Sequence, residues 1–140
     1  MNELMKVKKE ELEKRGYKGF TLMEMLIVVA IIAILVAIAI PVFSSQLNNA
    51  HVAADAANIR GGYAAVSAKV LTDKVSTEKT YQLNADGTVS ETATTAYTTT
   101  GDNSTDGTTI AGQDVKWASG KTVSYTYNPT TNIITINVAQ

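Results

Sequence analysis

The chain of 140 residues contains no cysteine, a single histidine and only two prolines. Without cysteine it has no disulfide framework, no thiolate metal site and no cysteine nucleophile. The one histidine, His51, excludes a zinc site built from several imidazoles. We also recognise no Ser/His/Asp arrangement, no phosphate-binding glycine loop and no carboxylate pair in a credible pocket. The sequence therefore predicts neither an enzyme nor a bound cofactor.

Charged residues are absent from positions 25–54. By contrast, positions 1–19 hold six of the 12 basic residues and four of the 13 acidic ones. The rest of the chain therefore carries six basic and nine acidic residues, which argues against a basic nucleic-acid-binding domain. The formal net charge of -1 averages a basic beginning and an acidic remainder.

A long apolar run follows the basic segment. Every residue from Met25 to Ile40 is apolar. As a helix, the segment 20–43 would extend about 36 Å at ~1.5 Å per residue, enough to cross a hydrocarbon core of about 30 Å. The excess of Lys and Arg before this run predicts that residues 1–19 stay in the cytoplasm while the remainder lies outside. We expect a polar leader over residues 1–19 and a membrane-spanning helix over residues 20–43.

Residues 44–72 continue the helical pattern with two stripes. A stripe of larger apolar residues is predicted to cover a sheet, and a stripe of small residues either packs inside the same domain or lets helices approach closely. Gly61 and Gly62 predict a bend or fray, because glycine weakens a helix. The large-residue stripe is Val52, Ala56, Ile59, Tyr63, Val66 and Val70, and the small-residue stripe is Ala50, Ala53, Ala57, Gly61, Ala64 and Ala68.

Residues 73–140 are rich in threonine and alternate between apolar and polar residues, as strands do. Turn sequences at 84–87 and 128–132 separate the alternating segments. The pattern predicts a meander of about four antiparallel strands, with residues 93–112 as a long exposed loop. Together the chain is expected to be an α+β protein, in which one long helix packs on a small antiparallel sheet. The aromatic residues Trp117, Tyr125 and Tyr127 are expected in the core or at its rim rather than in an adhesive patch.

One segment has the spacing of a calcium loop. Asp102, Ser104 and Asp106 place oxygen ligands at alternate positions before Gly107, but the twelfth position is Gln113, where a bidentate Glu is expected. This departure favours a solvated turn, so we predict no metal site and keep calcium as a weak candidate.

The segment Lys18-Gly19-Phe20-Thr21-Leu22-Met23-Glu24, followed by the apolar run, resembles the class III signal of type IV prepilins. The resemblance covers residues 15–43 and implies that a prepilin peptidase cleaves between Gly19 and Phe20 and methylates the new amino group of Phe20. The chain is similar to an N-methyl-Phe pilin, and its lack of cysteine is similar to pilins of Gram-positive bacteria. The leader is longer than most that precede such a Phe.

Two further residues have roles that follow from this resemblance. Glu24 lies at the start of the apolar run, where a lone carboxylate is costly. The resemblance implies that Glu24 pairs with the Phe20 amine of a neighbouring subunit during assembly, and breaking such a buried pair costs about 3 to 5 kcal/mol. Pro41 removes a helix hydrogen bond and clashes with the preceding turn, so the helix is expected to kink or loosen there.

The resemblance implies a major pilin, a structural subunit that is stored in the membrane and assembles into a helical filament at the cell surface. Such a filament serves twitching motility, adhesion, aggregation or DNA uptake, and the sequence does not choose among them. The implied partners are other copies of the chain, the prepilin peptidase, and separate platform and motor proteins. The nearest alternative is a pseudopilin of a type II secretion or competence system. A different class is a secreted or membrane-anchored binding module, cleaved after Ala37-Ile38-Ala39 or left uncleaved.

Overall fold

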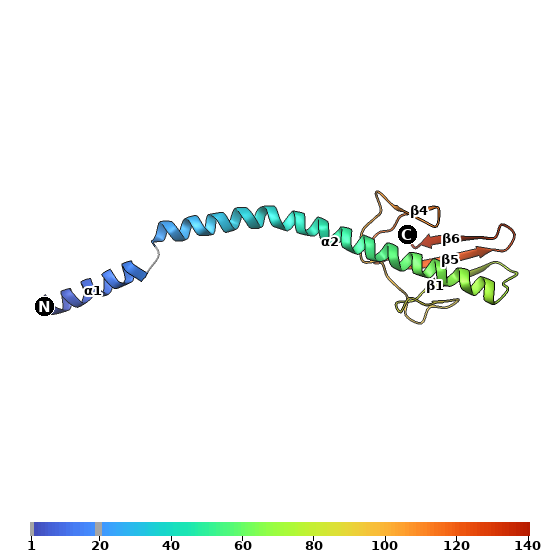
Figure 1. Ribbon diagram of the computed structural model, residues 1–140, viewed down its shortest axis with the longest axis horizontal. Coiled ribbons are helices and arrows are strands. Elements are labelled where there is room, and N and C mark those ends of the chain that lie inside the picture. Colours follow the sequence, from blue (N-terminus) through green and yellow to red (C-terminus); the bar gives the residue numbers. More distant parts are fainter. Residues whose placement is uncertain (1, 19–20) are drawn as a thin grey trace. The chain divides into compact units, whose positions relative to one another are not determined.

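The computed structural model describes residues 2–18 and 21–140, and Figure 1 shows the helices and strands that they form. The chain divides into two compact units, one ending at Ser44 and the other comprising Ser45–Gln140. The described residues form a long helix and a small antiparallel sheet, which confirms the α+β prediction. The elements are α1 (Asn2–Lys18), α2 (Leu22–Thr72), β1 (Lys79–Leu83), β2 (Val89–Ser90), β3 (Thr108–Ile110), β4 (Gln113–Val115), β5 (Val123–Asn128) and β6 (Ile133–Val138).

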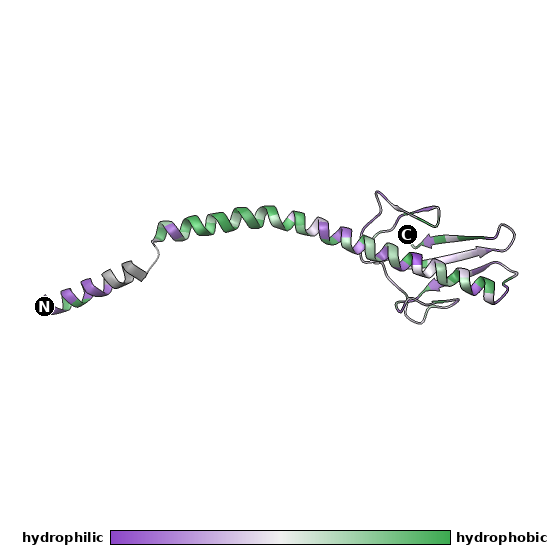
Figure 2. Cartoon of the chain, in the orientation of Figure 1, coloured by the Kyte–Doolittle hydropathy of each residue, from purple (hydrophilic) through white to green (hydrophobic). Residues whose placement is uncertain are grey.

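The first half of α2 is apolar around its whole circumference, as Figure 2 shows. Its large apolar side chains between Leu22 and Phe43 are between 45 % and 79 % exposed. An 18-residue window reaches a mean hydropathy of 3.3, so α2 is long and apolar enough to cross a membrane. The helix runs through Pro41, and a loosening at this residue stays a prediction.

In the second unit, the predicted large-residue stripe of α2 packs against one face of the sheet (Figure 1). Alternation along β5 and β6 turns one side of each strand toward this helix. The resulting core confirms the predicted stripe, since four of its six members are buried and Val52 and Tyr63 are partly buried. The core comprises Ala56, Ile59, Val66, Val70, Tyr81, Leu83, Val89, Ile110, Val115, Trp117, Val123, Tyr125, Tyr127, Ile134 and Ile136.

The small-residue stripe lies on the opposite side of α2, where all six members are exposed. Of the two roles predicted for this stripe, packing inside its own domain is therefore excluded, and close approach of another helix stays a prediction. The fray expected at Gly61 and Gly62 is wrong, because α2 continues through both residues, and a bend there stays a prediction. Gly62 instead makes room for the sheet: a Cβ there would overlap the Tyr125 hydroxyl. That hydroxyl donates a hydrogen bond to the Ile59 carbonyl (2.7 Å), and burial raises the pKa of Tyr125.

The sheet differs from the predicted meander in its strand order. The order is β2-β1-β5-β6 with antiparallel pairing throughout, so β1 lies beside β5, with Tyr81 opposite Tyr125. After β2, the chain leaves the main sheet and forms a second, two-stranded sheet from β3 and β4 before it returns as β5. Strand β4 therefore pairs outside the main sheet.

Residues 93–112 are less exposed and less irregular than their composition predicted. They contain β3, and within them Thr99, Gly101 and Asn103 are buried. Isolated bridges join Ala96 to Asn84 and Thr98 to Thr122. The polar composition was misleading because this segment satisfies its polar groups against the helix and the neighbouring strands.

Candidate processing and assembly site

The residues predicted for processing, Gly19 and Phe20, lie outside the described residues. The description resumes at Thr21, which precedes the first residue of α2. The Thr21 backbone N–H donates to Glu24 Oε2 (3.1 Å), and the Glu24 N–H donates to Thr21 Oγ1 (3.2 Å). This reciprocal pair is a capping box, which satisfies two backbone donors that a helix start otherwise leaves free.

The capping box gives Glu24 a partner within its own chain. The partner predicted for Glu24 from the resemblance was the amine of a neighbouring subunit alone. The Thr-x-x-Glu spacing of Thr21 and Glu24, placed directly before an apolar run, was the signal for the cap. The carboxylate also lies in the first turn of α2, where the helix dipole favours negative charge.

The second unit holds a polar cluster that the sequence analysis missed. Asp55 is 0 % exposed, although it is ionisable. Its Oδ1 accepts hydrogen bonds from the Tyr97 hydroxyl (2.5 Å), the Thr100 N–H (3.0 Å) and the Thr100 hydroxyl (3.1 Å). Its Oδ2 accepts from the Gly101 N–H (2.8 Å) and Trp117 Nε1–H (3.0 Å). These donors compensate the cost of placing a carboxylate in the interior.

These contacts lower the pKa of Asp55. Burial alone raises the pKa, but hydrogen bonds from Tyr97, Gly101, Thr100 and Trp117 favour the charged form and outweigh it. The same arrangement raises the pKa of Tyr97 to about 12, because its phenol is buried and donates to the carboxylate. Asp55 is therefore charged and Tyr97 is protonated at neutral pH.

Two further contacts hold the segment 97–103 on α2. The Asn48 side chain bonds the backbone of Asp102 twice: Nδ2 donates to the carbonyl (3.1 Å), and Oδ1 accepts from the N–H (2.9 Å). Between Asn48 and Asp55, Gly101 approaches the helix so closely that a Cβ would lie 2.6 Å from the Val52 nitrogen. A pattern could have revealed Asp55, since it follows Val52 by three residues and thus lies within the apolar stripe.

The weak calcium candidate is a self-contained turn. Asp102 Oδ1 accepts from the Ser104 N–H (3.0 Å) and hydroxyl (2.6 Å), as in an Asx turn. Those bonds lower the pKa of Asp102. In the part of the chain that the structure describes, no group of three or more His, Cys, Asp or Glu residues could hold a metal ion. Gln113, at the twelfth position, instead bonds the backbone of β6.

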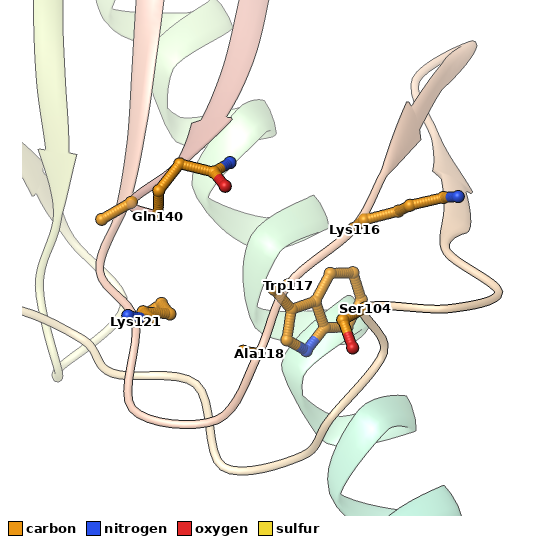
Figure 3. Close-up of a pocket in the computed structure, with 7 residues that line it drawn as sticks. Ser104, Lys116, Trp117, Ala118, Lys121 and Gln140 are labelled. Carbon is orange, nitrogen blue, oxygen red and sulfur yellow. The ribbon is translucent and has the colours of Figure 1, made fainter.

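A concavity of about 300 Å³ lies beside Trp117 (Figure 3). Lys116 and Lys121 extend to opposite sides of it, so their charges do not converge on one ligand. Trp117 is only 2 % exposed and offers no stacking surface, as expected for a core residue. Tyr125 and Tyr127 are also buried, and His51 is partly buried. These features do not favour a ligand site.

Residues 14–40 match the family described as the prokaryotic N-terminal methylation motif, a stretch that includes the start of α2. No solved structure matches the chain.

One similar protein is the type IV narrow pilus major component PilA5 of Thermus thermophilus. It is 56 % identical over 50 residues, which cover 34 % of this chain and 43 % of that protein. The matched region thus spans less than half of the relative's length. The motif and this relative support a type IV pilin, but they do not support an origin in a Gram-positive bacterium.

Proposed function

We propose that the chain is a structural subunit of a type IV pilus, stored in the membrane and assembled into a surface filament through its N-terminal helix. The observation that carries the proposal is the methylation motif at residues 14–40, which leads into a helix that is apolar on every side. A helix exposed all round has no apolar partner within the described chain, so it needs lipid or other helices around it. The name of the Thermus relative supports the role of a major pilin.

In this proposal, a prepilin peptidase cleaves between Gly19 and Phe20 and methylates Phe20. Residues 1–19 face the cytoplasm before cleavage, and the second unit becomes the filament surface after assembly. Separate platform and motor proteins drive the polymerisation. The role is structural rather than enzymatic, and Pro41 marks where the helix loosens when subunits pack.

The capping box adds a step to the proposed assembly. Before assembly, the Glu24 carboxylate accepts the Thr21 N–H and lies at the positive end of the helix dipole. This partner reduces the cost of holding a carboxylate at the border of the apolar run. We propose that cleavage supplies the methylated amine of Phe20, which a neighbouring subunit then offers to Glu24.

The first experiment determines the N-terminus of the protein recovered from membranes and from sheared cell-surface material. Mass spectrometry is expected to find a chain beginning at methylated Phe20, and electron microscopy to find long filaments composed mainly of this chain. A chain beginning at Ile40 would identify a secreted module and exclude the proposal. Correct processing without filaments would favour the pseudopilin.

A second experiment distinguishes the two roles of Glu24, as a helix cap and as a charged partner of a neighbouring subunit. Gln is accepted at this position of a capping box but carries no charge. We therefore expect Glu24→Gln to be cleaved normally and to start α2 at the same residue, but to give few filaments. Glu24→Asp, which keeps the charge, is the matched control. Normal filament yield from Glu24→Gln would show that charge pairing is not needed for assembly.

A further inference from the structure

Strand β6 is an edge strand with a sequence that favours strand pairing. In the sheet order it has a neighbour on one side, β5. Its six residues, Ile-Ile-Thr-Ile-Asn-Val, include five that are β-branched and none that is charged, proline or glycine. Segments of this length and composition pair readily with other strands when an edge is open.

The Gln113 side chain covers the outer side of β6. Its Nε2 donates to the Ile134 carbonyl (2.6 Å), and its Oε1 accepts from the Ile136 N–H (2.9 Å). A residue of an added parallel strand, opposite Thr135, would bond this same carbonyl and N–H. The Gln113 amide therefore takes the place of one peptide unit of a further strand.

The β3–β4 hairpin holds Gln113 in this position. The Gln113 backbone pairs with Ile110 in the hairpin, which leaves the side chain available to β6. Ile110 and Val115 are buried in the core, and β4 contacts β6 (Figure 1). Gln113 is therefore presented from a packed element rather than from a mobile loop.

We propose that the outer edge of β6 is a latent strand-pairing surface for β6 of a second copy of this chain, and that the Gln113 amide keeps it closed. The strand itself lacks the lysine, proline or bulge that commonly protects an edge. Protection therefore comes from a side chain of another element. The inference does not depend on the proposed pilus function.

The test compares the wild type and two variants of the full chain, purified in detergent micelles, by sedimentation and thioflavin fluorescence. Gln113→Ala removes both edge hydrogen bonds and is expected to raise the associated fraction several-fold over wild type. Gln82→Ala, which removes a glutamine from the central part of the same sheet, is the matched control and is expected to behave as wild type. Gln113→Ala that stays at the wild-type level would overturn the proposal.

A rescue variant distinguishes edge pairing from unfolding. Thr135→Lys places a charge on the exposed side of β6, and two such charges repel when edges meet. In the Gln113→Ala background it is expected to return association to the wild-type level. Association that persists in Gln113→Ala/Thr135→Lys would mean that unfolded chains associate elsewhere, and the proposal would be wrong.

Discussion

At the scale of single residues, Asp55 determines how the segment 97–103 meets the helix. Its carboxylate accepts from five donor groups, two of which are backbone N–H groups of Thr100 and Gly101. These donors lie 42 to 62 residues away in the sequence. A pattern of apolar spacing can place Asp55 on the buried face of α2, but it cannot name partners so distant. The stripe around Asp55 was therefore predictable from the sequence, whereas the cluster of donors was not.

The first prediction concerns Asp55→Asn. The Asn amide is close in shape to the Asp carboxylate, but its NH₂ group is itself a donor. It would face the hydroxyl and N–H donors around position 55, and those buried donors would lose their acceptor. We expect a loss of about 2 to 4 kcal/mol in the free energy of unfolding, measured by denaturant titration followed by circular dichroism. Asp106→Asn, at an exposed position in a neighbouring turn, is the control and should stay within about 0.5 kcal/mol of wild type. Equal stability of the two variants would contradict the role of Asp55.

At the scale of elements, local sequence patterns predicted the helices and strands better than they predicted how the strands pair. Alternation identified β1, β5 and β6, and the helical stripe identified the buried face of α2. The pairing of β1 with β5 was not predictable, because about forty residues separate the strands and either edge of a hairpin accepts a neighbour. The role of Gly62 was also hidden, since it depends on a hydroxyl from the sheet.

The second prediction concerns the turn of the β3–β4 hairpin. Ala111 and Gly112 both have positive φ, 51° and 78°, as a two-residue type I′ turn requires. Alanine is disfavoured there by about 1 to 2 kcal/mol, whereas asparagine tolerates this conformation. We expect Ala111→Asn to stabilise the chain by about 0.5 to 1 kcal/mol, measured as a rise in the thermal midpoint. Ala85→Asn, at an exposed position without positive φ, should give no such gain.

At the scale of the whole molecule, the two units were predicted from two segments of different composition. The apolar run without charge predicted a helix long enough to cross a membrane, and α2 has this length. The threonine-rich remainder predicted a sheet but overstated its exposed loop, because hydroxyl and amide groups can be satisfied inside a fold. Processing at Gly19 and Phe20 and the assembly roles of Glu24 and Pro41 stay predictions.

The third prediction is a pH dependence of stability. The pKa of Asp55 is lower in the folded chain than its usual value near 3.9. Its stabilising effect is therefore complete above about pH 4 and is lost as the pH falls through the folded-state pKa. Unfolding free energies measured between pH 2 and 6 should fall more steeply in acid for wild type than for Asp55→Asn. Parallel curves would show that Asp55 has an ordinary pKa.

At alkaline pH, stability is expected to fall as the pH rises, because Tyr97 loses its proton. Its folded-state pKa of about 12 exceeds the usual value near 10. The stability from its protonated phenol is present below about pH 10 and is lost as the pH rises toward 12. Tyr97→Phe should be less stable than wild type at pH 7, with the difference narrowing above pH 10 in the same measurement.

The contact between Trp117 and Asp55 gives the molecule an internal optical reporter. The chain has one tryptophan, and its indole N–H bonds the carboxylate that fastens the segment 97–103 to α2. The emission of a single indole beside a charged acceptor depends on that acceptor and on exclusion of water. Detachment of this segment is therefore visible in the intrinsic fluorescence of the unlabelled chain, whether in a membrane, in a micelle or in a filament.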